Sequence, residues 1–582
     1  MGIRVLLLLT GVAFLSLLTT TVDAQSPRQR EGVDVPLQIT THKQEITDGQ
    51  FVLYAYQVVL SRDADDIGGA HNLNILEQAT FTRQQLFTAF MAGQEFFTTP
   101  GLNNDTNYIR RLYQYLLKRP NPPTATEIQI HLTTLQNWMA SGKSREQAWY
   151  DLFNAFISLP EYGNANCTTQ GWSYGRQLRD GAPSLEDLFS GKARFQNTSE
   201  GQRINLNFQG TTVDPWDQKL PIIFHNNSYI GFTRGFLGSE AHPDLDVFML
   251  YSNDGINFGQ ATRIFTGRAD VGIPQDVTGQ ISLYDPHIST DYSYCPMRYS
   301  MTMECDGRLC MSESSTPWLK WAWSKPKLVV DGGLVSGGPF NNRWLSASTG
   351  TTIVDKTGKR YVYWTAIDNG ENYPFQPIDD DGDESASVRG AFMGSLNVPA
   401  FADAGSSLMT AESNTNCTSS WDCNNKDNQD MKYEGEKYYS IYNGANYYGC
   451  IQAANDTGTN DWALSVARST SPLGNFDTNR LGKLVDSTLK DMCGISYPVV
   501  NEIDGELYLY YSHHITKRII NHTKRSKLVY IADINQDGKA DIADVLWLIS
   551  VFGRTGTNTA DLDGNSLVNS LDYAKTVSLL EI

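Results

Sequence analysis

The chain lacks a long apolar run beyond its first 24 residues, which excludes a membrane-spanning helix in the rest of the sequence. It also lacks an excess of basic residues. The formal net charge is −18, which argues against nucleic acid or an anionic membrane as a partner. No Cys-x-x-Cys motif and no histidine at ligand spacing accompany the eight cysteines, so disulfide bonds are favoured over a zinc site. Aromatic residues are abundant, with 29 Tyr and 12 Trp, and in secreted chains such rings stack on sugars or fill β-rich cores.

Residues 1–24 have the pattern of a signal peptide. Arg4 supplies the positive charge, residues 5–18 the apolar stretch, and Val22-Asp23-Ala24 a small-residue cleavage site. We therefore expect a secreted, extracellular protein without a membrane span after cleavage. An uncleaved N-terminal anchor is the alternative.

All eight cysteines follow this segment, and in an oxidising compartment we expect them to pair. Cys305 and Cys310 are close enough in sequence to staple one loop, and so are Cys417 and Cys423. The full connectivity does not follow from the sequence.

A chain of 582 residues is too long for one hydrophobic core, so we expect several domains. Residues 25–46 are polar and contain proline, which is typical of a linker. Residues 47–165 have apolar side chains at helical spacing, residues 205–528 have short strands and turns, and residues 529–582 form a separate acidic segment.

The acidic C-terminal segment contains two loops with oxygen-bearing residues at positions 1, 3, 5, 9 and 12, and a main-chain carbonyl at position 7. Ca²⁺ prefers six to eight oxygen ligands, so each loop is a candidate site. The candidate ligands are Asp533, Asn535, Asp537, Lys539, Asp541 and Asp544 in the first loop, and Asp561, Asp563, Asn565, Leu567, Asn569 and Asp572 in the second.

An apolar helix is expected after each loop, over residues 545–552 and 574–580. Loop and helix, repeated once, resemble a type I dockerin. The resemblance implies two EF-hand-like Ca²⁺ sites and a cohesin-type partner on a scaffold or cell-surface protein. The family recognises its partner through loop positions 10 and 11, which here are Ile542-Ala543 and Ser570-Leu571. Because these two pairs differ from each other, the cohesin class stays open. A pair of acidic surface turns is the alternative.

The helical region contains an internal repeat. Residues 51–62 align with residues 108–119, and Glu95-Phe96 aligns with Glu161-Tyr162. This pattern resembles the DUF4214 repeat, a helical module without established chemistry. We therefore interpret the aromatic residues here as core.

Five segments between residues 205 and 528 share a similar pattern of strand and turn residues, which predicts a five-bladed β-propeller. They start near Pro221, Tyr284, Gly350, Tyr438 and Tyr497, and residues 402–432 are interpreted as a polar insertion between blades. The turns at residues 251–258 and 467–476 resemble those of five-bladed glycosidase propellers, the class of arabinanases, xylosidases, invertases and levansucrases.

Glycoside hydrolysis needs two carboxyl groups, one as acid and one as base or nucleophile. In the resembled enzymes the base is the Asp of an Asp-Pro that starts a blade, and Asp285-Pro286 has that form. The first blade reads Lys219-Leu220-Pro221 instead, without an acid. Glu434 is the candidate acid, with Glu436 beside it. For each carboxylate a structural role is the alternative.

Two functional classes therefore stay open. The first is an exported glycoside hydrolase that acts on polysaccharide, hydrolyses O-glycosyl bonds and is tethered by its dockerin. The second is a catalytically inactive propeller that binds glycan or protein in a cell-surface assembly. The acidic run at residues 379–384 is a further calcium candidate or a solvated loop.

Overall fold

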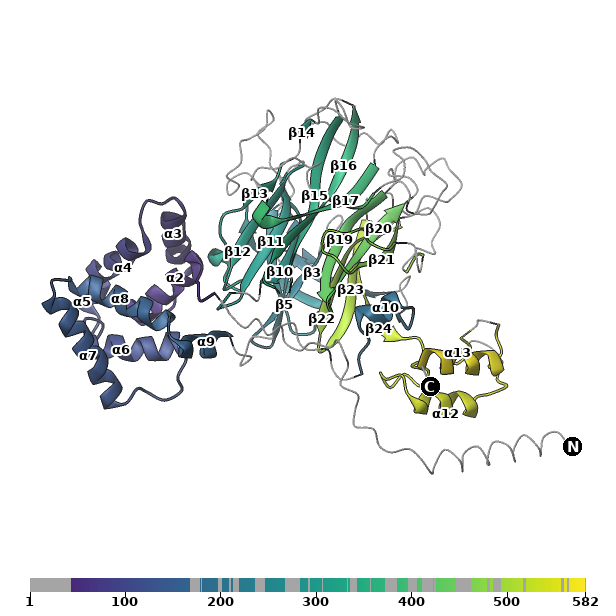
Figure 1. Cartoon of the computed structure of the whole chain (residues 1–582), viewed down its shortest axis with the longest axis horizontal. Coiled ribbons are helices and arrows are strands. Elements are labelled where there is room, and N and C mark those ends of the chain that lie inside the picture. The colour runs from purple at the N-terminus through teal and green to yellow at the C-terminus, as the bar shows by residue number, and fades with distance from the viewer. Residues whose placement is uncertain are drawn as a thin grey trace, which may run out of the picture.

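The computed structural model describes the chain between residues 43 and 580, with gaps. The described residues are 43–167, 178, 181–196, 201–208, 211–212, 219–235, 246–266, 283–291, 294–305, 307–331, 333–334, 343–355, 357–371, 385–395, 406–410, 422, 425–445, 462–478, 482–484, 494–516, 520–555, 559–562 and 565–580. They form a helical part, a β-propeller and a C-terminal pair of helices (Figure 1). Within these ranges no helix is long and apolar enough to cross a membrane. The predicted signal peptide, the acidic run at 379–384 and four of the eight cysteines fall outside them.

The helical part consists of two copies of one unit, which confirms the predicted repeat. The first contains α2 (Asp48–Ala55), the π-helical turn η1 (Tyr56–Leu60), α3 (Asp66–Glu77), α4 (Arg83–Ala92) and α5 (Gln94–Thr98). The second contains α6 (Asp105–Arg111), the π-helical turn η2 (Leu112–Leu116), α7 (Ala125–Ala140), α8 (Arg145–Ile157) and α9 (Pro160–Cys167). Capping boxes at Thr82 and Thr124 fix where α4 and α7 begin, because each side chain accepts a hydrogen bond from an otherwise unpaired backbone N–H.

A shared set of contacts shows how closely the two units correspond. In each, an arginine lies over a tyrosine ring, 4.8 Å and 4.4 Å from the centroid, and forms an ion pair with a glutamate. The two sets are Tyr56, Arg62 and Glu95, and Tyr113, Arg119 and Glu161. The aligned sequence positions thus occupy equivalent places, and the aromatic residues fill one core as expected.

Five antiparallel blades follow. The first blade contains β5 (Ile222–His225), β6 (Ser228–Gly235), β7 (Asp246–Ser252) and β9 (Thr262–Phe265), and the second contains β10 (Leu283–Asp291), β11 (Arg298–Cys305), β12 (Leu309–Ser314) and β13 (Lys327–Val330). The third contains β15 (Arg343–Val354), β16 (Arg360–Glu371), β17 (Ser385–Phe392) and β18 (Ser406–Met409). The fourth contains β19 (Asn425–Glu434), β20 (Lys437–Ala445) and β21 (Ala463–Ser469), and the fifth contains β22 (Gly494–Ile503), β23 (Glu506–Thr516) and β24 (Ile520–Tyr530). The turns expected at residues 251–258 and 467–476 begin at the ends of β7 and β21, the third strands of the first and fourth blades.

The fifth blade is completed by chain that precedes the propeller. β1 (Ala193–Phe195) and β2 (Gln202–Arg203) both pair antiparallel with β24. Short helix α10 (Leu185–Phe189) packs its apolar side chains on the same core. The propeller therefore draws on residues before the expected start at 205, because closing the ring requires a strand from the other end of the domain.

The fourth blade starts one strand earlier than predicted. Its inner strand is β19, whereas Tyr438 lies in the second strand, β20. The stretch at 402–432 is therefore not merely an insertion, since it contributes β18 and most of β19. The prediction failed because β19 is almost entirely polar, and its buried Asp427 and Asp430 do not read as core residues.

A short segment after β12 joins the helical part to the propeller. Trp321 and Ala322 belong to the core of the helical part. A Cβ atom on Gly69 would lie 2.4 Å from the Trp321 ring, so α3 packs directly against it. Ion pairing of Lys320 with Asp66 at 2.7 Å adds a polar contact at the edge.

The C-terminal module contains α12 (Ile542–Ser550) and α13 (Ser570–Leu580), each preceded by one of the predicted loops. The two loops have the same internal hydrogen bonds. Asp544 accepts from the backbone N–H of Ile534 at 2.7 Å, and Asp572 accepts from that of Leu562 at 2.7 Å. Both aspartates are fully buried. The sequence duplication is therefore a structural duplication.

Candidate functional site

Four inner strands of the propeller have a β-bulge at the same place. The register shifts lie between Tyr284 and His287, Ser348 and Thr351, Asp427 and Asp430, and Ser496 and Val499. At each bulge one residue has a positive φ, and these residues are Asp285 (48°), Thr349 (35°), Asn428 (48°) and Tyr497 (56°). Positive φ in residues other than glycine costs about 1–3 kcal/mol each and is concentrated at functional sites.

These residues meet around one axis. Thr349 Oγ1 lies 3.2 Å from Asp285 Oδ2 and 2.7 Å from Asn428 Oδ1. The first blade adds Arg234 from β6, whose guanidinium is 3.2 Å from Asp285 Oδ1 and lies over the Tyr497 ring at 5.6 Å. All five blades therefore contribute one member to this axial cluster, which we define as Arg234, Asp285, Thr349, Asn428 and Tyr497.

Arg234 and Asp285 form a buried ion pair, with side chains 8% and 4% exposed. Burying two charges costs desolvation energy, and their mutual attraction offsets this cost only when the two groups are well placed. The pair is therefore a specific feature of the axis. Asp285 was the sequence candidate for a catalytic base, and in the structure it is a nearly buried member of the axial cluster. There it is held by a cation and a hydroxyl group rather than by a second carboxylate.

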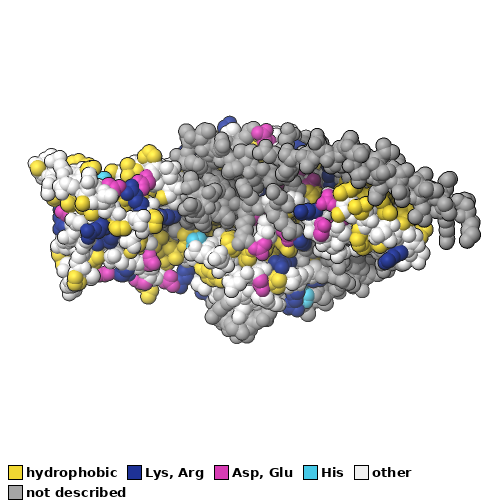
Figure 2. Space-filling view, turned by 90° about the horizontal axis from the view of Figure 1, so that it is seen from below, with side chains coloured by type: hydrophobic (Ala, Val, Ile, Leu, Met, Phe, Trp, Pro, Cys, Tyr) yellow, Lys and Arg dark blue, Asp and Glu magenta, His cyan; other side chains and the backbone are white. Residues whose placement is uncertain are grey.

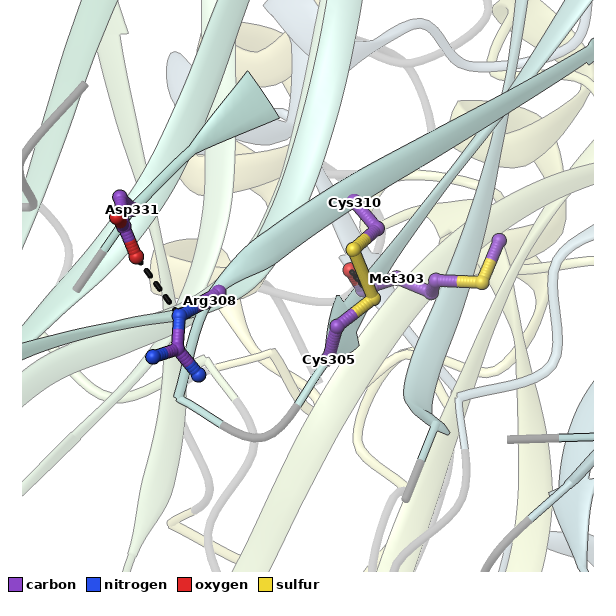
Figure 3. The surroundings of a disulfide bond; sticks show 5 residues. All are labelled: Met303, Cys305, Arg308, Cys310 and Asp331. Atoms are coloured by element: carbon purple, nitrogen blue, oxygen red, sulfur yellow. Dashed lines mark hydrogen bonds and ion pairs between the residues drawn. A yellow bond between two sulfur atoms is a disulfide. The ribbon is translucent and has the colours of Figure 1, made fainter. Parts of the chain in front are cut away.

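Glu304 on β11 is the nearest candidate for a second acid. Burial, with repulsion from Asp285 as the next cause, raises its pKa to about 7, and Ser348 Oγ donates a hydrogen bond to it. Its position is fixed by the β11–β12 hairpin, where the Cys305–Cys310 disulfide joins the strands and Arg308 bonds Asp331 at 2.8 Å (Figure 3). This is the local staple that the cysteine spacing predicted.

A second polar layer lies beneath the axial cluster. His287 Nε2 contacts Asp430 Oδ1 at 2.6 Å, and Asp430 Oδ2 accepts the backbone N–H of Val500 at 2.6 Å. Burial lowers the pKa of His287 to about 4. For Asp430, burial is outweighed by Lys432, His287 and the Val500 N–H, and its pKa falls to about 2. At neutral pH this layer thus holds a neutral imidazole and a carboxylate that is fully engaged.

Lys219 precedes β5 of the first blade, where the sequence has no acid. Its Nζ donates to the carbonyl of Gln429 at 3.0 Å. Burial lowers the pKa of Lys219 to about 8, against the opposing attraction of Asp285, Asp430 and Asp427. The first blade therefore brings a cation toward the axis, in agreement with the missing acid in its sequence.

Glu434, the candidate general acid, is not brought to the axial cluster. It ends β19, and both of its carboxylate oxygens accept from the backbone N–H of Leu185, at 3.2 Å and 3.3 Å. Leu185 is the first residue of α10, so this contact stabilises a helix N-terminus. Glu436 is an exposed residue of the next turn.

Sequence reasoning missed Arg234, Glu304, Thr349 and Asn428. A signal existed for part of the set: Tyr497-Pro498-Val499 repeats the pattern of Asp285-Pro286-His287 at a strand start. Aligning the other inner strands on that pattern finds Thr349 and Asn428. Arg234 and Glu304 come from second strands and have no such signal.

The calcium candidates are a separate possible site. In the first loop Asp533 Oδ2 accepts from Gly538 N at 3.0 Å, while Asp533 Oδ1 is buried without a hydrogen-bond partner in the described residues. Burial raises the pKa of Asp533, and repulsion from Asp544 and Asp537 adds to the rise. An orphaned oxygen in a loop that concentrates negative charge fits a cation.

The second loop repeats this geometry, since Asp561 Oδ2 accepts from Ser566 N at 2.7 Å. Asp563 lies outside the described residues. No group of three or more His, Cys, Asp or Glu side chains that would by itself hold a metal ion is found in the described part of the chain. Binding would thus depend on Asn and main-chain carbonyl oxygens as well, which Ca²⁺ accepts.

Solved structures of glycoside hydrolases resemble this chain distantly. An α-L-arabinofuranosidase from Clostridium thermocellum is 14% identical with a TM-score of 0.31, over 50% of this chain and 81% of that one. An exo-β-1,3-galactanase from the same organism is 12% identical with a TM-score of 0.36, over 57% and 63%. An exo-1,5-α-L-arabinanase from a bovine ruminal metagenomic library is 14% identical with a TM-score of 0.33, over 54% and 93%.

At these identities and TM-scores the likeness carries no argument about activity. No curated protein matches the chain. Residues 37–100 match the family model described as a domain of unknown function, DUF4214, so the N-terminal helical part contains a DUF4214 domain.

Proposed function

We propose that the propeller binds carbohydrate at its axial cluster and does not hydrolyse it. The observation that carries this proposal is the Arg234–Asp285 ion pair. Hydrolysis needs two carboxyl groups placed on either side of the bond. The bulge positions equivalent to Asp285 hold a hydroxyl, an amide and a phenol instead.

The same groups suit sugar recognition. Carboxylate, guanidinium and amide groups bind vicinal hydroxyls, and an aromatic ring packs on the apolar face of a pyranose. Tyr497 is the aromatic member and is only partly buried. A small number of placed polar groups beside an aromatic surface is the usual composition of a ligand site.

The test uses a panel of polysaccharides and two readouts, retention on the immobilised polymer and release of reducing sugar. We expect retention without release. Asp285→Asn should change retention little, because the amide keeps the hydrogen-bonding shape, whereas Tyr497→Ala should reduce it. Tyr573→Ala, an exposed tyrosine of α13, is the matched control. Release of sugar that Asp285→Asn abolishes would instead establish the enzyme.

Hydrolysis is the second candidate, and the raised pKa of Glu304 favours it. A carboxyl with a pKa of about 7 beside Asp285 has the form of an acid paired with a base. In that case Glu304→Gln and Asp285→Asn should each abolish turnover. If both variants leave the activity of the wild type unchanged, these carboxylates are not its catalytic pair.

We further propose that the C-terminal module binds two Ca²⁺ ions, one in each loop. The duplicated hydrogen bonds and the orphaned Asp533 oxygen support this. Calorimetric titration of the chelator-treated full chain with Ca²⁺ should give two sites. Asp533→Ala and Asp544→Ala should each weaken the first site, Asp544→Ala more, because Asp544 also braces the loop backbone. One site or none in the wild type would contradict the proposal.

The module also presents an apolar surface suited to a cohesin-type partner. Ile542, Leu546 and Ile549 follow one face of α12 at helical spacing and are 53%, 52% and 51% exposed. Figure 2 shows hydrophobic side chains gathered over this end of the molecule. We expect Ca²⁺-dependent binding to one member of a cohesin panel, lost in Leu546→Glu and kept in Lys143→Glu.

Export is part of the same proposal. A signal peptide at residues 1–24 and a disulfide at Cys305–Cys310 both agree with an extracellular, oxidising compartment. N-terminal sequencing of protein secreted by an expression host should begin after Ala24. Retention of the segment in a membrane fraction would favour the anchor.

A further inference from the structure

A cavity of about 250 Å³ lies between the helical part and the propeller, away from the axial cluster. One wall comes from α2, η1, η2 and α9, and the other from the chain before β11 and after β12. Ligand sites occur preferentially where domains meet. Both walls are held in place, because Trp321 lies in the helical core and the backbone N–H of Lys325 bonds Glu77 at 2.9 Å.

The lining is polar and aromatic. Gln50 contributes an amide group and is 5% exposed, whereas the amide of Asn166 already bonds Tyr54, Leu116 and Tyr162. Thr316 is 2% exposed, and its Oγ1 has no hydrogen-bond partner in the described residues. A buried hydroxyl that lacks a partner costs free energy unless a ligand or water satisfies it. Trp318 adds a flat wall, and its ring stacks on His225 at 3.7 Å.

Charge in the cavity has one sign. Lys118 is the one charged side chain among the lining residues, and the lining contains no carboxylate. Lys118 is an exposed residue, and partial burial lowers its pKa. The neighbouring His225 also has a lowered pKa, of about 4. Burial is the larger cause and repulsion from Lys118 is the smaller one.

We propose that the cavity binds a single carboxylated sugar unit, a hexuronate. Its carboxylate pairs with Lys118, its hydroxyls bond Gln50 and Thr316, and its ring lies against Trp318. The volume agrees with one ring, because larger organic ligands occupy pockets of about 300–1,000 Å³. This site is independent of the axial cluster and of whether the propeller hydrolyses glycans.

The test is calorimetric or saturation-transfer NMR titration of the full chain with galacturonate, galactose and acetate. Galactose keeps the ring without the carboxylate, and acetate keeps only the carboxylate. We expect galacturonate to bind about tenfold or more tightly than either, since a charge-assisted contact is added to ring contacts. Equal affinity for galactose, or no binding of galacturonate, would overturn the proposal.

Two variants locate the site. Lys118→Gln should weaken galacturonate binding about tenfold, and Thr316→Val should weaken it without removing charge. Lys143→Gln, on an exposed lysine of the helical part, should leave it unchanged. If Lys118→Gln does not fold by circular dichroism, Thr316→Val decides. Unchanged binding in the folded cavity variants refutes this location.

Discussion

At the scale of residues, the buried Arg234–Asp285 pair predicts a specific pattern of stability. Arg234→Met removes the cation paired with the buried Asp285. Removing one partner of such a pair lowers the free energy of unfolding by about 3–5 kcal/mol. The double variant with Asp285→Asn should regain much of this loss, because it removes the uncompensated charge as well. Urea unfolding of the two single variants and the double variant measures the coupling. Additive losses would show that the pair is not coupled.

Glu304 predicts how stability depends on pH. Its pKa in the folded protein is raised to about 7, so the folded state favours the protonated form. The contribution of Glu304 to the free energy of unfolding is fully present below about pH 4.5 and is lost as the pH rises through 7. Glu304→Gln should therefore match the wild type at pH 4 and exceed it at pH 8, by at most about 3 kcal/mol. Equal stability at pH 8, measured by thermal unfolding, would contradict this.

The sequence located one axial residue and missed most of the others for a physical reason. Asp285 is recognisable because Asp-Pro marks a strand start. Thr349 and Asn428 reach the axis only because a bulge turns the backbone there. Glu434 was favoured because a carboxylate in a Tyr-rich segment resembles a strand acid; its structural partner, Leu185, is distant in sequence and could not be anticipated.

At the scale of elements, a glycine in α2 should respond to substitution by alanine in the opposite direction from most helical glycines. Replacing glycine by alanine within a helix normally stabilises by about 1 kcal/mol. At Gly49, however, a Cβ would lie 2.6 Å from the carbonyl oxygen of Ala322, a backbone atom that cannot move aside. Gly49→Ala should therefore lower the melting temperature. Gly259→Ala is the control for added bulk, because the backbone there is not in the left-handed region and a Cβ would meet no atom closer than 3.5 Å.

Elements with regular patterning were predictable, and those without it were not. The helical repeat was found because its apolar and aromatic spacing recurs in α2 and α6. Blades with Tyr- and Val-rich strands were found for the same reason. β19 was missed because its buried side chains form hydrogen bonds, as Gln429 does with Thr349 and Thr365, rather than an apolar stripe.

At the scale of the whole molecule, the cysteines give a prediction that includes residues beyond the described ranges. Cys305 bonds Cys310, Cys295 is also disulfide-bonded, and no cysteine in the described ranges is free. We expect mass spectrometry after alkylation without reduction to find few modified thiols among the eight cysteines. A majority of alkylated cysteines would count against an oxidising destination.

Pairing of β1 with β24 has a consequence for how the protein is made. Phe195 faces Leu528 across this pair, so the strand that closes the ring emerges from the ribosome long before its partner exists. At translation rates of about 5–20 residues per second, β1 waits roughly 15–70 s. During that interval the backbone groups of β1 that pair with β24 have no native partner. A translating cell therefore has to protect this short segment until the last blade is complete, and a ribosome stalled before residue 520 yields a propeller that cannot close.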